Sequence, residues 1–177
     1  MESIQLQDYL AINNIAFEWA DRMDEISRCL DTNPHGIVYA LPATRCTFML
    51  TSWQVDYSII GQKCIPEMRA EEYLAMVSSP TLVGDPLICT QHLLGAAKYE
   101  KVSDFEIVAI HQIRAAHQRY KDLARTTVAY QGHNYGSVKH WYKKTDGVWK
   151  LAGVQPESYW LEHDFDKIFA QSSEESL

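Results

Sequence analysis

The sequence has few basic residues, and this shortage excludes several classes of function. It carries 16 Lys and Arg residues against 23 Asp and Glu residues, a formal net charge of −7. Nucleic-acid phosphates and anionic lipid surfaces both require a basic face, so we expect neither partner. An uninterrupted apolar stretch of about 18 residues, as a membrane-spanning helix needs, is missing. The first residues show no basic segment followed by an apolar core, so we expect no secretion signal and a cytoplasmic location.

Cysteine is scarce and is not arranged in pairs. The four cysteines, Cys29, Cys46, Cys64 and Cys89, form no Cys-x-x-Cys motif. Reduced thiols in a cytosolic setting explain them better than a disulfide framework does. Their spacing relative to the histidines fits no zinc signature, so we expect no metal.

The chain does have enough material for one ordinary globular domain. Its 177 residues are 46% hydrophobic and 22% charged, and a chain of this length can bury a sizeable core. We find no internal repeat, linker or second domain. The sequence therefore predicts a single domain that covers residues 1–177.

The hydrophobic spacing predicts helices first and strands later. The predicted helices are Leu6–Asp21, Asp24–Leu30, Pro66–Ser78 and Asp164–Phe169. The predicted strands are Gln54–Ile60, two histidine-bearing strands between Thr90 and Tyr120, Thr126–Lys144 and Val148–Val154, after which Pro156 is expected to break the sheet. Residues 36–53 follow neither period. This order of elements indicates an α+β fold.

Three of the seven histidines lie on the two central strands and give the strongest indication of chemistry. Histidine moves protons near neutral pH, so the pattern predicts a cofactor-free proton-transfer site in a curved sheet. His111 and His117 share one strand face, but at about 3.3 Å per residue they lie roughly 20 Å apart. One of them is therefore structural, and His92 on the neighbouring strand can lie opposite only one of them.

Several other positions each allow two interpretations from the sequence alone. Asp24 is either a helix cap or a carboxylate that orients a histidine. Tyr57 is either a core tyrosine or a hydrogen-bond donor inside a pocket. The helix at Asp164–Phe169 either packs on the sheet or forms a lid over an apolar mouth.

The long strand near the carboxyl terminus contains two glycines and two further histidines. Gly132 and Gly136 predict a bulge or a close approach of another group to the backbone. His133 and His140 are expected to be structural or exposed.

Motifs spread over nearly the whole chain resemble the scytalone dehydratase family. They include Phe17-Glu-Trp-Ala-Asp21, Val55-Asp-Tyr57, Ala70-Glu-Glu-Tyr73, Gly84-Asp85-Pro86, Thr90-Gln91-His92, His117-Gln-Arg-Tyr-Lys-Asp122, His140-Trp-Tyr-Lys-Lys144 and Asp146-Gly-Val-Trp-Lys150. The resemblance implies a nuclear-transport-factor-like α+β barrel, in which a cone-shaped, curved antiparallel or mixed sheet wraps around helices. It also implies a homotrimer that needs no metal or organic cofactor.

The resemblance further implies a reaction and assigns residues to it. The family removes water from scytalone and vermelone, bicyclic hydroxyketones of fungal melanin synthesis, by acid–base catalysis. By this resemblance His92 and His117 are catalytic, Asp24 orients His117, Tyr57 holds the carbonyl, and His111 is structural. The residues implied to surround the substrate are Met23, Ile60, Met76, Leu82, Gly136, Val138, Phe165 and Phe169, with a lid helix at about 162–170.

The sequence departs from the family pattern in ways that bear on the substrate. Met23 replaces a tyrosine, and Gly136 and Val138 replace a serine and an asparagine that bond to substrate oxygens. Ser137 could substitute for that serine only if the strand register shifts. An insertion at about residues 36–53 is either a loop at the cavity rim or a translated unspliced segment. We therefore expect a dehydratase of a bicyclic hydroxyketone such as scytalone or vermelone, or of a related aromatic polyketide intermediate, in a pocket that the apolar replacements reshape towards a less oxygenated ligand.

Two alternatives stay open at this stage. The same histidines could serve a polyketide cyclase or isomerase, which needs no β-hydroxyketone. The fold could also persist in a binding protein without catalysis.

Overall fold

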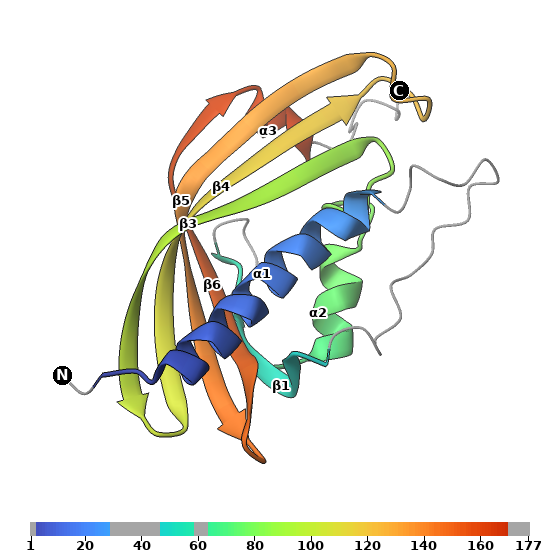
Figure 1. Cartoon of the computed structure of the whole chain (residues 1–177). Helices are drawn as coiled ribbons and strands as arrows, with labels where there is room; N and C mark the ends of the chain where they lie inside the picture. The colour runs from blue at the N-terminus through green and yellow to red at the C-terminus, as the bar shows by residue number, and fades with distance from the viewer. Residues whose placement is uncertain (1–2, 29–46, 59–63, 170–177) are drawn as a thin grey trace.

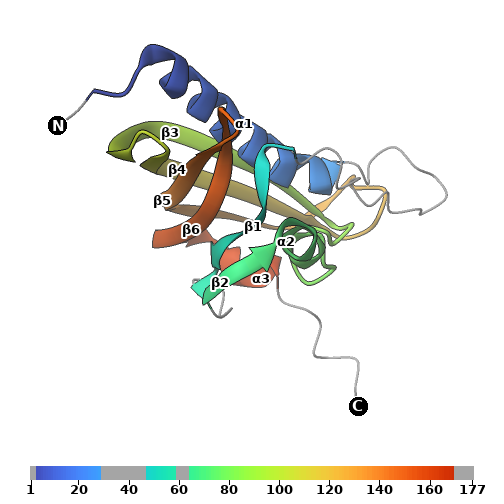
Figure 2. The same ribbon diagram turned by 90° about the horizontal axis from the view of Figure 1, so that it is seen from below.

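The structure is a computed structural model that describes residues 3–28, 47–58 and 64–169. Its centre is a six-stranded sheet in the order β2-β1-β6-β5-β4-β3. The four long strands bend strongly, and helix α1 lies across their concave side with α2 beside its C-terminal half (Figure 1; Figure 2 shows the view from below). The predicted α+β class and the curved mixed sheet are confirmed.

One continuous helix, α1 (Leu6–Arg28), replaces the two helices that we expected at the amino terminus. Its buried apolar residues recur at helical spacing without a break: Ile12, Ile15, Trp19, Met23 and Ile26. This stripe packs on the sheet. Its burial stabilises the helix, which therefore continues through Asp21 and Arg22. Asp24 therefore lies inside the helix and is buried, so it is not a helix cap.

The segment after α1 forms an edge hairpin and a short helix. Strand β1 (Met49–Asp56) pairs antiparallel with β2 (Cys64–Arg69) and parallel with β6. The predicted start of a helix at Pro66 is wrong, because Pro66 lies in the edge strand β2, where proline is tolerated. Helix α2 (Ala70–Val77) begins after Arg69, whose backbone N–H donates to Glu72 Oε2 at 3.0 Å.

The insertion at 36–53 falls only partly within the described residues. Residues 49–53 belong to β1, whereas residues 36–46 lie outside the described part of the chain.

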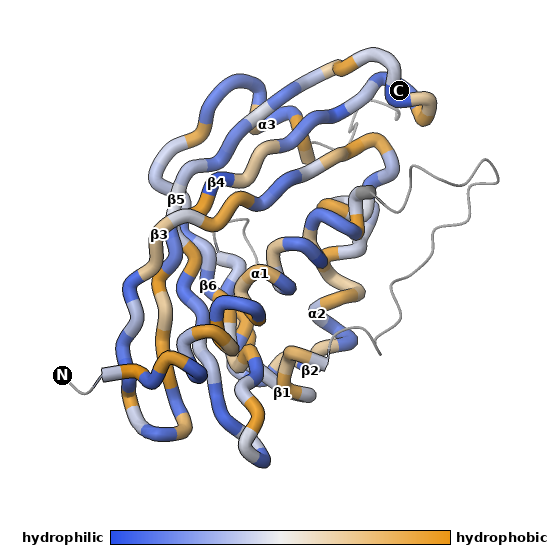
Figure 3. Tube along the Cα trace, viewed as in Figure 1, coloured by the Kyte–Doolittle hydropathy of each residue, from blue (hydrophilic) through white to orange (hydrophobic). Residues whose placement is uncertain are grey.

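The remaining strands form a long antiparallel meander, as the sequence predicts. They are β3 (Ile88–Ser103), β4 (Glu106–Tyr120), β5 (Val128–Thr145) and β6 (Val148–His163), followed by the short helix α3 (Phe165–Ile168). Hydrophobic and hydrophilic residues alternate along these strands (Figure 3). The expected break at Pro156 is wrong. The pairing of β1 with β6 extends only to Val154, so β6 has an open side at Pro156 and continues to His163.

Gly132 and Gly136 mark close approaches to β5, as predicted. A Cβ on Gly132 would lie 2.4 Å from Phe165 Cα, so this glycine lets α3 pack directly on the strand. A Cβ on Gly136 would lie 1.8 Å from the Glu157 carbonyl oxygen, at a bulge between β5 and β6. Both glycines therefore shape the end of the cone that holds Phe165.

His111 and His140 are buried in the core under α1, where a structural role is expected for both. His140 Nδ1 lies 3.0 Å from the Tyr142 hydroxyl, and that hydroxyl lies 3.4 Å from His111 Nε2. Burial lowers the pKa of His111 from 6.5 to about 4 and that of His140 well below 6.5. Both side chains therefore stay neutral at neutral pH.

Candidate active site

A small, mostly apolar cavity lies between α1, the inner face of the long strands and the phenylalanines at the carboxyl-terminal end. Its volume is about 110 Å³. Seven of the residues expected at the site line it: Met23, Tyr57, Leu82, His92, His117, Phe165 and Phe169. The fold thus brings together residues from opposite ends of the chain.

Within the described residues, three other expected contacts, Met76, Gly136 and Val138, are not among those that line the cavity. Val138 faces inward but is fully buried in the core, and Met76 packs on the outside of that core. The space beside Gly136 is filled by the Glu157 carbonyl. Their assignment as substrate contacts is therefore not supported by this geometry, and Ile60 lies outside the described residues.

The cavity also contains residues that sequence reasoning missed. They are Trp19, Val77, Val83, Ile113, Ala115, Asn134, Pro156 and Glu157. Ile113 and Ala115 share the strand parity of His117, so that parity could have identified them. Asn134 has the parity of Gly132 on β5, but a polar residue between two glycines gives no sign of whether its face is inside or outside.

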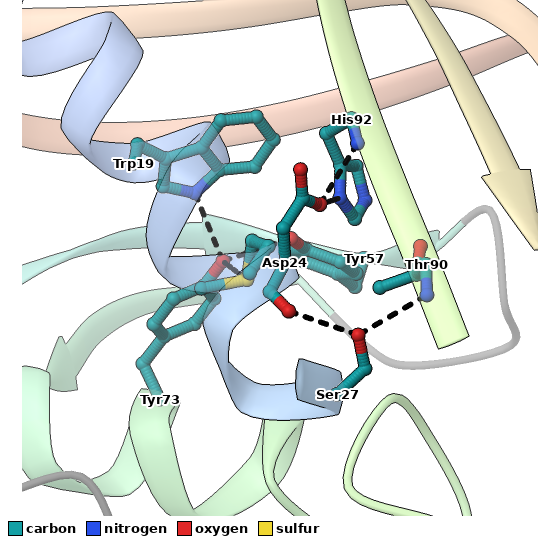
Figure 4. Close-up of polar contacts among 8 residues, drawn as sticks. Trp19, Asp24, Ser27, Tyr57, Tyr73, Thr90 and His92 are labelled. Atoms are coloured by element: carbon teal, nitrogen blue, oxygen red, sulfur yellow. Dashed lines mark hydrogen bonds and ion pairs between the residues drawn. The ribbon is translucent and has the colours of Figure 1, made fainter. Parts of the chain in front are cut away.

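Asp24 and His92 form the central polar pair of the site. Asp24 Oδ1 accepts hydrogen bonds from the His92 backbone N–H and from His92 Nδ1, each at 2.8 Å (Figure 4). The expectation that Asp24 orients His117 is therefore wrong, because its carboxylate bonds to His92. With Nδ1–H donated to the carboxylate, Nε2 of His92 is left as a proton acceptor.

The end of α1 is tied to β3 beside this pair, which fixes the position of Asp24. Ser27 Oγ donates to the Asp24 backbone oxygen at 2.9 Å and accepts from the Thr90 N–H at 3.1 Å (Figure 4). Arg125 Nη2 donates to the Ser27 carbonyl at 3.1 Å. The helix and the strand are thus joined three residues from Asp24 and two residues from His92.

His117 lies beside His92 in a dry environment. The two ring centroids are 6.1 Å apart and the rings are nearly perpendicular. The rings of Phe165 and Phe169 cover His117 at 5.5 and 5.1 Å, and within the described residues His117 Nδ1 has no hydrogen-bond partner. Burial and then the neighbouring His92 lower the pKa of His117 from 6.5 to about 3, so it is a neutral imidazole.

A chain of hydrogen bonds reaches the cavity through Tyr57. Trp19 Nε1 donates to the Tyr73 hydroxyl at 3.1 Å, and the Tyr73 and Tyr57 hydroxyls are 2.9 Å apart (Figure 4). The Tyr73 hydroxyl can donate its one proton to Tyr57 or, at 3.6 Å, to the weaker acceptor Met23 Sδ. When it donates to Tyr57, the Tyr57 proton is free for a ligand.

Desolvation keeps Tyr57 protonated. Burial raises its pKa from 10 to about 12, and the hydrogen bond from Tyr73 only partly offsets this. The cavity therefore combines an imidazole held by a carboxylate, a second, neutral imidazole and a phenolic donor, which suits proton transfer next to a carbonyl.

Comparison with known proteins shows the family to which the chain belongs. The sequence model of the family described as scytalone dehydratase matches residues 3–176 of the chain. The chain belongs to the scytalone dehydratase family. It is therefore an enzyme of the hydro-lyase class.

Fungal members of the scytalone dehydratase family match over most of both chains. The scytalone dehydratase PfmaJ of Pestalotiopsis fici is 40% identical over 177 residues, covering 97% of this chain and 83% of that protein. The scytalone dehydratase of Pyricularia oryzae is 40% identical over 173 residues, covering 98% and 92%.

A solved structure supports the fold. Hexachlorocyclohexane dehydrochlorinase LinA-type3 of Novosphingobium barchaimii superposes with a TM-score of 0.65 at 14% identity, covering 89% of this chain and 90% of that one. The fold is thus the nuclear-transport-factor-like cone that the sequence predicts.

A possible metal-binding cluster lies away from the cavity. His133, Glu162 and His163 place their ligand atoms within 4.8 Å of one another. Arg114 Nη2 lies 3.3 Å from His133 Nδ1, so a permanent positive charge already occupies this place and opposes a dication. Cys64 is an exposed, free cysteine. We therefore assign no metal role to these residues.

A larger open groove lies on the outer side of the sheet and does not compete with the cavity. It has a volume of about 630 Å³ and is lined by Ser137, Lys139, Glu157 and neighbours, without a histidine. Ser137 Oγ donates to Glu157 Oε2 at 3.3 Å there. Ser137 therefore does not replace the missing serine inside the cavity.

Within the described residues, no helix is both long and apolar enough to cross a membrane.

Proposed function

We propose that this enzyme removes water from a bicyclic hydroxyketone such as scytalone or vermelone, or from a related aromatic polyketide intermediate of melanin-type synthesis. The observation that carries the proposal is the Asp24–His92 pair, which presents a proton acceptor to a cavity that also holds His117 and Tyr57. The names of the fungal relatives support the same substrate class.

His92 is the proposed base. Its Nε2 removes the proton next to the substrate carbonyl, and the electron pair of that C–H bond forms an enolate. Asp24 stabilises the imidazolium that results, since its carboxylate already accepts the Nδ1–H bond at 2.8 Å. The β-hydroxyl then leaves as the enolate collapses to the double bond, and His92 returns the proton to it as water forms. These steps remove one water molecule and return His92 to its starting state without a cofactor.

Tyr57 and His117 support the two changing oxygens in this proposal. The Tyr57 phenol donates to the carbonyl oxygen as negative charge develops on it, which commonly contributes about 2.7–4 kcal/mol. His117 stays neutral because its pKa is about 3, so it acts as a hydrogen-bonding partner of the leaving hydroxyl and not as a charged acid.

Substrate entry requires movement of the phenylalanines. The cavity of about 110 Å³ is smaller than the roughly 300–1,000 Å³ of typical ligand pockets. Phe165 begins α3, Phe169 follows it, and both rings cover His117, so their displacement would enlarge the cavity. We therefore propose that the segment at about 162–170 acts as a lid on the cavity. We also propose that the whole chain forms one domain.

The proposed assembly is a homotrimer. Large apolar side chains, among them Leu93, Tyr159 and Trp160, are more than half exposed in this chain, and such patches commonly mark interfaces. Sedimentation velocity of the wild type and of Trp160→Glu tests this, with a shift toward monomer expected for the variant.

A cytoplasmic location stays a prediction.

The decisive experiment for the reaction is absorbance-monitored turnover of scytalone, vermelone and a panel of polyketide ketones that lack the β-hydroxyl. Turnover confined to the hydroxyketones supports the dehydratase. Turnover of the ketones without water loss would favour a cyclase or isomerase, and binding without turnover would favour a non-catalytic relative.

A further inference from the structure

Asn134 brings a carboxamide into the cavity from a wall that Tyr57 does not occupy. It lies on β5 opposite Ala115 of β4, whereas Tyr57 follows β1, two strands away in the sheet order. It lines the same cavity as His92 and His117. Among the described lining residues it is the one side-chain amide.

Ser158 holds one end of this amide. Its Oγ donates to Asn134 Oδ1 at 2.8 Å. A bulge in β6 makes the contact possible, because Gly136 pairs with Ser158 while Tyr135 pairs with Trp160. Ser158 thus lies on the same face of the sheet as Asn134.

The other end of the amide is available to a ligand. With Oδ1 bonded to Ser158, Nδ2 is the remaining polar atom, and within the described residues no hydrogen bond reaches it. The neighbours on this face of β5 are Gly132 and Gly136, which have no side chains, and Ala115 opposite is small. Since His117 pairs with Gly132 and Ala115 with Asn134, Asn134 is a diagonal neighbour of His117, about 7–8 Å away.

We propose that Asn134 is a specificity-determining residue whose Nδ2–H donates to a second oxygen of the substrate, a ring hydroxyl distinct from the carbonyl at Tyr57. The inference rests on the proposed function for the bicyclic class of substrate. It adds that the preferred substrate carries a ring hydroxyl that reaches β5. Ser158 positions the amide and does not itself touch the substrate.

Two measurements test this assignment. The first is kcat and KM for scytalone and for vermelone, which lacks one ring hydroxyl of scytalone, in wild type, Asn134→Ala and Asn134→Asp. The second is the dissociation constant of naphthalene-1,3-diol and of 1-naphthol, measured by calorimetry. The second pair also differs by one hydroxyl and requires no turnover, so it stays informative if no hydroxyketone is dehydrated.

The expected result is a loss confined to the ligand with the additional hydroxyl. Asn134→Ala should raise the KM or dissociation constant of the ligand with the additional hydroxyl about 5- to 10-fold, the range of one neutral hydrogen bond. It should change kcat little. Asn134→Asp should be worse than alanine, since a carboxylate accepts but cannot donate. Ser158→Ala should give a smaller loss of the same kind, and the outer-face control Ser137→Ala none.

Three results would overturn the proposal. One is an equal loss for both members of each pair, which would indicate a general effect on packing. Another is wild-type behaviour of Asn134→Ala with both pairs. The third is retention of binding by Asn134→Asp, which would show that the cavity face of the amide accepts a hydrogen bond.

Discussion

Asp24 Oδ1 accepts two hydrogen bonds from the same residue, His92, one from its backbone N–H and one from its ring Nδ1, each at 2.8 Å. The backbone bond holds the carboxylate in place, and the ring bond fixes which imidazole nitrogen carries the proton. This double contact connects helix α1 to strand β3 at the cavity. The proposed chemistry depends on it because only this arrangement leaves Nε2 of His92 as the acceptor.

Removing the charge of Asp24 should therefore impair turnover more than stability. Asp24→Asn keeps the size of the side chain but no longer enforces the tautomer or stabilises the imidazolium. We expect kcat to fall by roughly 10²–10⁴, the range of a positioned acid–base group. Steady-state kinetics with a hydroxyketone check this, with Asp146→Asn in an exposed turn as the control. Unchanged kcat in Asp24→Asn would exclude the pair from the reaction.

The hydrogen-bond chain behind Tyr57 gives a graded prediction. Tyr57→Phe removes the carbonyl donor and should lower kcat by about 10²–10³. Tyr73→Phe removes the hydroxyl that lies 2.9 Å from the Tyr57 hydroxyl and accepts from Trp19 Nε1, so we expect a loss of about 10-fold that disappears when Tyr57→Phe is already present. Tyr142→Phe removes a buried hydroxyl outside the cavity and serves as the matched control. Fully additive losses for Tyr57 and Tyr73 would contradict the coupling.

Much of this arrangement followed from the sequence, and the failures have physical causes. The alternation along the long strands predicted β3, β4 and β5, and the two glycines of β5 predicted its close contacts. The two-helix prediction failed because Asp21 and Arg22 interrupt the composition of α1 but not its buried stripe.

The site was predicted less completely than the fold. His92, His117 and Tyr57 reach the cavity as expected. The partner of Asp24 could not be read from sequence, because both histidines lie within reach of a side chain whose direction depends on how α1 crosses the sheet. Asn134 was missed because a polar residue between two glycines does not show which face of β5 lines the cavity.

Acid should destabilise the protein through its buried histidines. Their pKa in the unfolded chain is near 6.5, whereas burial lowers it to about 3 for His117 and about 4 for His111 in the fold. The unfolded chain thus binds more protons between these values, so the free energy of unfolding falls as the pH drops below 6.5. The expected slope is about 1.4 kcal/mol per pH unit for each buried histidine.

Urea unfolding at pH 7 and pH 5 measures this slope. His117→Asn should reduce the difference between the two pH values, because it removes a histidine whose pKa burial lowers to about 3. An identical slope in wild type and His117→Asn would show that His117 is not buried as a neutral group.

Gly132 should be needed for closure of the cavity. A methyl group at this position would lie 2.4 Å from the Phe165 backbone, so Gly132→Ala must displace α3. We expect a higher KM and a lower melting temperature, measured by kinetics and thermal unfolding. A Cβ at Gly95 would meet Gln112 side-chain atoms at 3.2 and 3.3 Å and the Gln112 backbone oxygen at 3.7 Å, so Gly95→Ala should lose less. Equal behaviour of the two variants would argue against close packing of α3 on β5.

The rate of water elimination by His92→Ala tests the central claim most directly. The measurement is the absorbance change on dehydration of a bicyclic hydroxyketone, compared with the wild type and with His133→Gln, whose ring lies outside the cavity. We predict that His92→Ala folds normally by circular dichroism and loses at least about 10²-fold in kcat, while His133→Gln keeps the wild-type rate. A folded His92→Ala protein that eliminates water at the wild-type rate would contradict the account.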